Sequence, residues 1–281
     1  MQKALLNGFV RGRADLAKKI RLDAYLVEHG FAPDVKTAQA IVLSGLVYNK
    51  EVRLDTAGHM VGEKDVIEVR EKGLKFVSRG GLKLEKAMQV FQVSLADKTA
   101  MDIGASTGGF TDCMLQNGAA RVFAVDVGYG QLAWKLRSDK RVVNMERTNI
   151  RFVTEEMLGC RPTFASIDVS FISLGLVLPV LRTLLSEDAD IVALIKPQFE
   201  AEKEQVEAKG IVTNPAVHES VILRVLSFAK DNGMGVCGLD YSPVKGPEGN
   251  IEYLVHLKIG GADTTVDAAA VVAAAHGALQ K

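Results

Sequence analysis

Cysteine is scarce in this sequence, and the few cysteines present argue against two kinds of site. The 281 residues include only Cys113, Cys160 and Cys237. Their number is odd and their spacing is wide, which indicates neither a disulfide framework nor a cluster of metal ligands. We therefore expect a reduced, cytoplasmic protein that binds no metal.

Long hydrophobic runs are also missing. Residues 1–8 hold no apolar stretch long enough for a signal peptide, and the longest uncharged apolar run, Val169–Leu181, is interrupted by Ser, Gly and Pro. A helix that crosses a bilayer needs about 20 apolar residues, so the sequence predicts no membrane span and no membrane partner.

The chain carries no net charge, but its charges are unevenly distributed. Residues 1–86 hold 16 basic and 11 acidic residues, a difference of +5, whereas residues 87–281 hold 18 and 23, a difference of −5. A basic N-terminal part is compatible with a polyanionic partner, although an ordinary solvated surface explains five charges equally well. Hydrophobic residues make up 48% of the chain, enough to bury a full core.

The most informative segment is a glycine-rich turn, Met101–Asp112, between a strand pattern at residues 99–103 and a helix that starts near Gly108. Glycines let the backbone approach a ligand closely, and the N-terminus of a helix carries partial positive charge. A second strand pattern ends in Asp126, 24 residues after Asp102, where doubly wound folds place the carboxylate that binds a ribose. The arrangement predicts a nucleoside-binding βαβ unit.

The residue types in this turn favour S-adenosylmethionine (SAM) over NAD. The dinucleotide pattern Gly-x-Gly-x-x-Gly accommodates a pyrophosphate, but here Ser106 breaks the pattern and an acid, Asp102, precedes the turn. An acid at that point suits a cofactor with a cationic amino-acid tail and no phosphate, and a turn that binds nothing is the alternative. The residues predicted to bind the cofactor are Asp102, Gly104, Ser106, Thr107, Gly108, Gly109, Phe110, Asp126 and Asn149.

Strand and helix patterns alternate over the rest of the chain. Apolar strand patterns at residues 164–168, 191–195, 234–242 and 251–259 are separated by helix patterns at residues 174–185 and 214–232. This order predicts an α/β fold, a doubly wound, Rossmann-like and mostly parallel sheet with helices on both faces. We assign this domain to residues 77–260, after a linker at residues 71–76 and before an Ala-rich tail at residues 261–281.

Residues 21–70 form a separate small α+β module that follows a tail at residues 1–20. Two helix patterns, the second capped by Asp34, precede short strand patterns. The run Arg21-Leu-Asp-x-Tyr-Leu…Lys36-Thr-Ala-Gln-Ala…Ser44-Gly-Leu-Val-Tyr-Asn-Lys50 resembles the S4 family of RNA-binding domains. The resemblance implies that Arg21, Lys36, Ser44 and Lys50 lie on an RNA-binding face, where basic side chains neutralise phosphates. Lys36 stands where many S4 domains have Arg, so a point charge replaces a bidentate fork.

Four ionisable residues lie at the edges of predicted elements. Lys83 begins a helix, Asp168 and Lys196 end successive strands, and Glu252 begins the last strand. Ligands of open α/β sheets bind beyond the carboxyl ends of the parallel strands, which is where Asp168 and Lys196 would meet. Each residue alone is compatible with a surface charge or an ion pair, but together with the nucleoside-binding turn they indicate a catalytic site.

This set resembles the Lys-Asp-Lys-Glu tetrad of the FtsJ-like ribose 2′-O-methyltransferases. With the S4-like module, the runs Ser78-Arg-Gly-Gly-x-Lys-Leu84, Asp168-Val-Ser-Phe-Ile-Ser-Leu174 and Ile195-Lys-Pro-Gln-Phe-Glu200 resemble the haemolysin A or TlyA-type family of rRNA 2′-O-methyltransferases. The resemblance covers residues 21–259. It implies SAM as the methyl donor, a cytidine ribose in ribosomal RNA as the acceptor, and ribosomal RNA or ribosomal subunits as partners.

A ribose hydroxyl is a poor nucleophile until its proton leaves, and Lys196 is the predicted proton acceptor. The pKa of a lysine, about 10.4, must fall by about three units to make it half neutral at pH 7, on the order of 4 kcal/mol. Burial and the ammonium of Lys83 would lower the pKa of Lys196, whereas Asp168 and Glu252 would raise it. We therefore expect the two acids to orient the lysines and the ribose, and the proton to leave late.

Other functions have less support in the sequence. The segment Asp168–Phe171 lacks the two prolines typical of exocyclic-amine methyltransferases, and no cysteine adjoins a catalytic-looking proline, as attack on pyrimidine C5 requires. Two alternatives remain open, a membrane-active haemolysin and a non-enzymatic rRNA-binding chaperone.

Overall fold

The computed structural model describes residues 19–43, 45–50, 52–62, 64–69 and 75–279. The chain divides into two compact units, residues 1–74 and residues 75–281. The predicted linker at residues 71–76 spans this boundary, and only its last two residues are described; the predicted N-terminal tail lies almost entirely outside the described residues.

The first unit is a small α+β module built from two helices and short antiparallel strands. Its helices are α1 (Leu22–Glu28) and α2 (Val35–Leu43). A three-stranded sheet is formed by β2 (Val47–Asn49), β3 (Val52–Arg53) and β5 (Ile67–Val69), in the order β3-β2-β5. A second pair joins β1 (Ile20–Arg21) to β4 (Met60–Val61). Asp34 caps α2 as predicted, because its Oδ1 accepts the backbone N–H of Thr37 at 2.7 Å.

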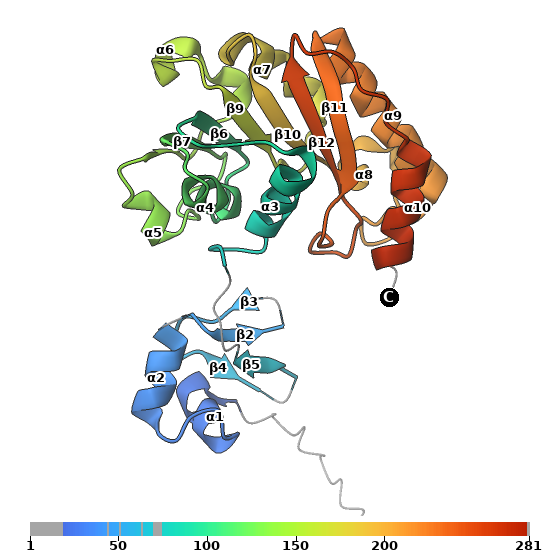
Figure 1. The fold of residues 1–281 in the computed structure, drawn as a ribbon. Helices are drawn as coiled ribbons and strands as arrows, with labels where there is room; N and C mark the ends of the chain where they lie inside the picture. The colour runs from blue at the N-terminus through green and yellow to red at the C-terminus, as the bar shows by residue number, and fades with distance from the viewer. Residues whose placement is uncertain (1–18, 44, 51, 63, 70–74, 280–281) are drawn as a thin grey trace, which may run out of the picture. The chain divides into compact units, whose positions relative to one another are not determined.

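A seven-stranded sheet forms the centre of the second unit (Figure 1). Its strands, in chain order, are β6 (Thr99–Ile103), β7 (Arg121–Val125), β8 (Val142–Met145), β9 (Phe164–Ile167), β10 (Asp190–Ile195), β11 (Met234–Tyr241) and β12 (Tyr253–Ile259). The order across the sheet is β11-β12-β10-β9-β6-β7-β8. Strand β12 runs in the direction opposite to that of the other six strands. The predicted mostly parallel α/β sheet is confirmed.

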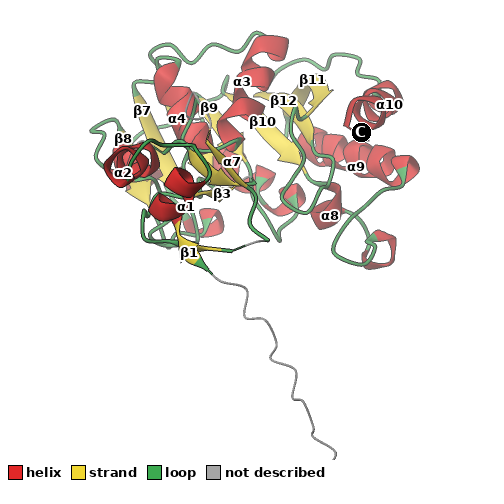
Figure 2. Ribbon diagram, turned by 90° about the horizontal axis from the view of Figure 1, so that it is seen from below, coloured by secondary structure: helices red, strands yellow, loops and turns green. Residues whose placement is uncertain are grey.

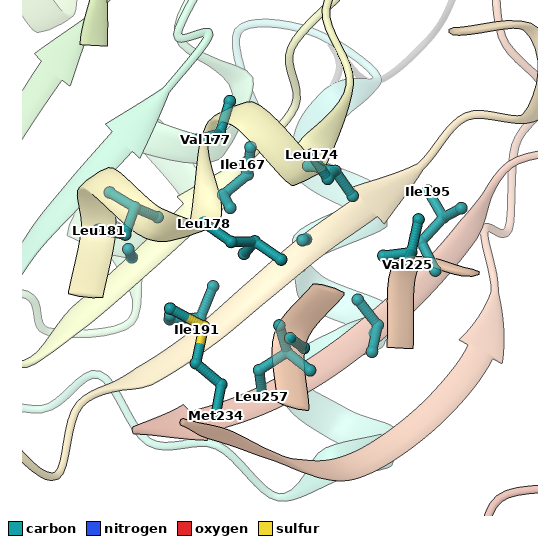
Figure 3. Close-up of a cluster of buried hydrophobic side chains, with 14 of the residues drawn as sticks. Ile167, Leu174, Val177, Leu178, Leu181, Ile191, Ile195, Val225, Met234 and Leu257 are labelled. Carbon is teal, nitrogen blue, oxygen red and sulfur yellow. The ribbon is translucent and has the colours of Figure 1, made fainter. Parts of the chain in front are cut away.

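Helices cover both faces of this sheet (Figure 2). They are α3 (Gly80–Phe91), α4 (Gly109–Gln116), α5 (Trp134–Arg137), α6 (Glu155–Leu158), α7 (Leu178–Leu184), α8 (Pro197–Glu200), α9 (Pro215–Asp231) and α10 (Ala268–Leu279), with short 3₁₀ turns η1 (Ile150–Phe152), η2 (Leu174–Leu176) and η3 (Lys203–Gln205). Strand β10 shows why two layers form. Ile191, Ala193 and Ile195 pack into the cluster of Figure 3, whereas Val192 and Leu194 pack on the opposite face with α3 and α4.

One segment differs from the expected elements. The single helix predicted at residues 174–185 is divided into η2 and α7, because Pro179 lies in the first turn of α7, the position where its missing N–H costs least. The Ala-rich tail forms α10, which contacts α9 and β11 and therefore belongs to the second unit.

Candidate active site

A cavity of about 780 Å³ lies at the carboxyl ends of β6, β7 and β9. Its lining includes the last residues of two strands, Ile103 and Val125. Ligands of open α/β sheets bind at this edge. Five of the residues singled out in the sequence line it: Gly104, Ser106, Asp126, Asn149 and Asp168.

Asp126 presents a fixed carboxylate to this cavity. Its Oδ2 accepts the backbone N–H of Ser106 at 2.7 Å, and its Oδ1 accepts the backbone N–H of Gly128 at 2.6 Å. The residue follows β7 directly, so the strand end and the two N–H groups set its position. A carboxylate has about four lone-pair sites, so it can accept further hydrogen bonds from a ligand diol.

Asp102, which the sequence placed directly before the glycine-rich turn, is fully buried and lies outside the cavity lining. Its Oδ2 accepts the backbone N–H and the hydroxyl of Thr111 at 2.9 and 2.6 Å, and its Oδ1 accepts the hydroxyl of Ser166 at 3.1 Å. Burial raises its pKa to about 6. In this arrangement Asp102 fastens the N-terminus of α4 to β6 and β9, and its predicted contact with the cofactor stays a prediction.

Four more of the predicted cofactor residues lie outside the cavity lining, namely Thr107, Gly108, Gly109 and Phe110. A Cβ on Gly109 would lie 2.3 Å from Ser78 Oγ, so this glycine allows close packing at the start of α3. Gly104 has φ +84°, and a Cβ there would lie 2.5 Å from the backbone oxygen of Asp168. Both glycines make room for the protein's own atoms, and Gly104 also lines the cavity, so the predicted close approach of a ligand stays a prediction.

The structure brings together the four ionisable residues that the sequence placed at element edges. Lys83 Nζ lies 2.6 Å from Glu252 Oε2 and 3.5 Å from Asp168 Oδ2, and Lys196 Nζ lies 2.5 Å from Asp168 Oδ1. The sheet sets part of this geometry, because Ile195 of β10 pairs directly with Tyr253 of the reversed strand β12. Lys196 and Glu252, one step beyond these partners, therefore reach the same edge.

Burial and mutual pairing determine the charges in this cluster. The side chains of Lys83 and Lys196 are each 10% exposed, and that of Glu252 is 1% exposed. Burial alone would lower the pKa of Lys83, but the carboxylates of Asp168 and Glu252 outweigh it and raise that pKa. Burial would raise the pKa of Asp168, but the two ammonium groups hold it below its usual value. Lys83 and Asp168 are therefore charged at neutral pH.

The loop after β9 contains a residue that the sequence analysis did not select. Phe171 lines the cavity, is 91% exposed and has φ +64°, a left-handed conformation that bulky side chains rarely adopt. Its ring lies 4.9 Å from that of Phe199. The same loop supplies Ser170, whose Oγ accepts a hydrogen bond from Lys196 Nζ at 3.2 Å. The run of apolar and hydroxyl residues between Asp168 and Leu174 carried no signal for this conformation.

Three of the four predicted RNA-binding residues can be located in the first unit. Arg21 forms a bidentate pair with Asp23, from Nε to Oδ1 at 3.0 Å and from Nη2 to Oδ2 at 2.7 Å. Lys36 is exposed in the first turn of α2, and Lys50 is exposed between β2 and β3. Ser44 lies outside the described residues.

The described ranges lack two features, a helix that could cross a membrane and a cluster of metal ligands. No helix in this part of the chain combines the length and the apolar character that crossing a bilayer requires. Among the same residues, no group of three or more His, Cys, Asp or Glu side chains is arranged to hold a metal ion.

Similarity to known proteins agrees with this geometry. Residues 76–259 match the family described as FtsJ-like methyltransferase. The chain is 54% identical over 242 residues to "Putative rRNA methyltransferase YqxC" of Bacillus subtilis, with 86% of each chain covered. It is 42% identical to "16S/23S rRNA (cytidine-2'-O)-methyltransferase TlyA" of Mycobacterium tuberculosis, covering 86% of this chain and 91% of that protein.

Two further similarities carry a different name. The chain is 42% identical to "Hemolysin A" of Brachyspira hyodysenteriae, covering 85% of this chain and all of that protein. The solved structure "Putative hemolysin from Streptococcus thermophilus" superposes with a TM-score of 0.74 at 46% identity and covers 93% of this chain and 97% of that one. Given the family match over most of the second unit, the chain belongs to the FtsJ-like methyltransferases and, as the sequence predicted, is an S-adenosylmethionine-dependent enzyme.

Proposed function

We propose that this enzyme transfers a methyl group to the 2′-hydroxyl of a cytidine in ribosomal RNA. The observation that carries the proposal is the arrangement of Lys83, Asp168, Lys196 and Glu252 beside a nucleoside-sized cavity. The names of the Bacillus and Mycobacterium relatives supply the substrate class, ribosomal RNA, and the Mycobacterium name supplies the nucleotide.

The residues around the cavity fit SAM. Asp126 would accept hydrogen bonds from the ribose diol, Asn149 and Ile150 would contact the adenine, and the turn at Gly104 and Ser106 would face the rest of the molecule. A cavity of this size is within the usual range of about 300–1,000 Å³ for small-ligand sites. When bound, SAM supplies an electrophilic methyl group on a sulfonium.

Lys196 is the base in this proposal. Lys196 Nζ would first release a proton to solvent and would then accept the proton of the ribose hydroxyl as that oxygen takes the methyl group, and the methyl donor would leave as a neutral thioether. Asp168 Oδ1 and Ser170 Oγ hold Nζ from two sides, so the lone pair has a defined direction once a proton has left. Lys83 stays charged between Asp168 and Glu252 and fixes both carboxylates. Most of the rate gain would come from this positioning.

Exposed aromatic and basic side chains around the cavity would hold the RNA. Arg151 lines the cavity, and Phe171 offers a ring on which a base can stack, a contact worth about 1–3 kcal/mol in single-stranded nucleic-acid sites. In the first unit, Arg21, Lys36 and Lys50 would neutralise phosphates, as in the S4 family that this unit resembles. The fork between Arg21 and Asp23 fixes the guanidinium in one orientation before RNA arrives.

The test is transfer of a labelled methyl group from SAM to unmodified ribosomal subunits and to their naked RNA. We expect label at a nucleotide that then resists alkaline cleavage, at least a hundredfold loss of rate in Lys196→Met, and an unchanged rate in the control Lys203→Met, which alters an exposed lysine of η3. SAM affinity should stay within about twofold in both variants.

The same preparations distinguish the alternatives. No label in any RNA despite SAM binding would contradict the proposal. Full activity in Lys196→Met would remove Lys196 as the base. Release of dye from lipid vesicles that is equal in wild type and Lys196→Met would support a lytic activity, to which the name of the Brachyspira relative points.

A further inference from the structure

We propose that Glu200 is a positioning residue that holds the loop at residues 168–174 in its active shape, an inference that rests on the proposed function. Glu200 ends α8, four residues after Lys196. Its Oε2 accepts the hydroxyl of Ser173 at 2.8 Å, and its Oε1 accepts the backbone N–H of Leu174 at 2.7 Å. It touches none of the four tetrad side chains through the hydrogen bonds and ion pairs found among the described residues.

The loop needs an anchor because it carries strain between its two ends. Phe171, with φ +64°, occupies a backbone region that costs about 1–2 kcal/mol for a side chain of this kind. At its start the loop is fixed by the backbone bond from Asp168 N–H to Ile103 O at 2.9 Å. At its end Leu174 is buried in the core cluster of Figure 3, and its N–H is held by Glu200. Such strain persists only where the surroundings over-determine the conformation.

Glu200 also closes a ring of contacts that includes the proposed base. Lys196 contacts the loop through Asp168 and Ser170, and α8 leads from Lys196 to Glu200, which returns to the loop at Ser173. The aromatic contact between Phe171 and Phe199 also joins the loop to α8. Loss of the anchor would therefore change the positions of Asp168 and Ser170 relative to Lys196.

The environment of Glu200 indicates that it is kept for geometry and not for stability. The residue is 8% exposed, and no ion pair joins it to any side chain among the described residues. Burial raises its pKa above the usual value, and the two hydrogen bonds only partly offset this. When the folded pKa of an acid is raised, stability is greatest below its ordinary pKa and falls as pH rises through the folded pKa, so ionising Glu200 carries a cost.

The experiment compares Glu200→Gln and Glu200→Ala with the matched control Glu202→Gln, which changes a glutamate whose side chain is 70% exposed. The amide keeps an acceptor for Leu174 N–H, and its NH₂ group can donate to the Ser173 hydroxyl, so both contacts remain but one is reversed and both lose the strength of a charged acceptor. Hydrogen exchange of the loop amides, melting temperature, SAM affinity, and kcat and KM for the RNA are measured on the full chain.

We expect loop exchange to speed up in the order wild type, Glu200→Gln, Glu200→Ala. The kcat should fall in the same order, by about threefold and then at least tenfold. SAM affinity should stay within twofold, Glu200→Gln should melt no lower than wild type, and Glu202→Gln should match wild type throughout. A fall in kcat without a fall in SAM affinity or melting temperature is the result expected if Glu200 positions the loop. Loss of a merely structural residue would lower all three quantities together.

Two outcomes would overturn the inference. One is a Glu200→Ala variant whose loop amides exchange hydrogen at the wild-type rate. The other is a variant whose loop amides exchange faster while kcat and KM stay at their wild-type values. Failure of the proposed function is distinguishable from both, because a wild type that methylates no RNA would still show whether loop exchange depends on Glu200.

Discussion

The buried pair between Lys83 and Glu252 allows stability and catalysis to be separated by a double-mutant cycle. Removing one partner of a buried pair usually costs about 3–5 kcal/mol, because the remaining charge is left without compensation. In Glu252→Gln, Lys83 keeps Asp168 at 3.5 Å, so we expect a loss near the lower end, about 3 kcal/mol. In Lys83→Met, the carboxylate of Glu252, whose side chain is 1% exposed, loses the partner at 2.6 Å, so we expect about 5 kcal/mol.

The double variant Lys83→Met/Glu252→Gln should recover most of this loss. Replacing a whole buried ion pair by uncharged groups is often neutral, so the coupling between the two substitutions should be at least about 2 kcal/mol. For a unit of this size each kcal/mol shifts the melting temperature by about 2–4 °C. We therefore expect drops of about 6–12 °C and 10–20 °C for the single variants, and a drop of a few degrees for the double variant.

Activity should not follow stability in this series. Methyl transfer should be lost in both single variants and stay lost in the double variant, because Asp168 then keeps only Lys196 of the two ammonium groups that hold it. Thermal unfolding and labelled-methyl transfer on the same preparations measure both quantities. Additive losses of stability, or an active double variant, would refute the assignment of Lys83 and Glu252 to one paired site.

The remaining predictions concern backbone space and pH. Gly104→Ala should weaken SAM binding at least tenfold in calorimetry, because the new Cβ meets the backbone oxygen of Asp168. The control Gly210→Ala is also at positive φ, but nothing lies within 4 Å of its new Cβ, so it should cost only about 1–2 kcal/mol of stability and leave SAM affinity unchanged. Burial lowers the pKa of His218, which contacts the Tyr253 hydroxyl at 2.6 Å, so its stabilising effect is complete above its ordinary pKa of about 6.5 and is lost as pH falls. The drop in melting temperature from pH 7.5 to 5.5 should be smaller in His218→Phe than in wild type, and an equal drop would contradict this.

The ends of the parallel strands could be predicted from the sequence because they depend on local patterns. Apolar runs located β9 and β10, and an ionisable residue after each run indicated a shared edge. The positions of Asp168 and Lys196 follow from that rule alone. Glu252 could be placed at the same edge only with the resemblance to a tetrad, since nothing in its own segment reveals that β12 runs antiparallel.

Contacts between distant segments account for what the sequence analysis missed. The packing of Gly109 against the start of α3 could not be predicted, because a glycine-rich turn has the same composition whether it faces a ligand or another helix. Phe171 gave no signal, since its left-handed backbone depends on anchors at both ends of the loop. In the sequence, Glu200 stands out only as the last residue of a run that resembles the family, and its burial became apparent only from the contacts between α8 and the loop.

The carboxylate of Asp102 at the head of α4 has a consequence for cofactor choice. Folds that take dinucleotides leave this helix end open for a phosphate group. Here the protein supplies an anion of its own, already bonded to the N–H and hydroxyl of Thr111, so an incoming pyrophosphate would meet like charge where it seeks hydrogen-bond donors. We therefore expect a variant with a wider cavity still to reject NAD, because Asp102 would continue to occupy the N–H group of Thr111.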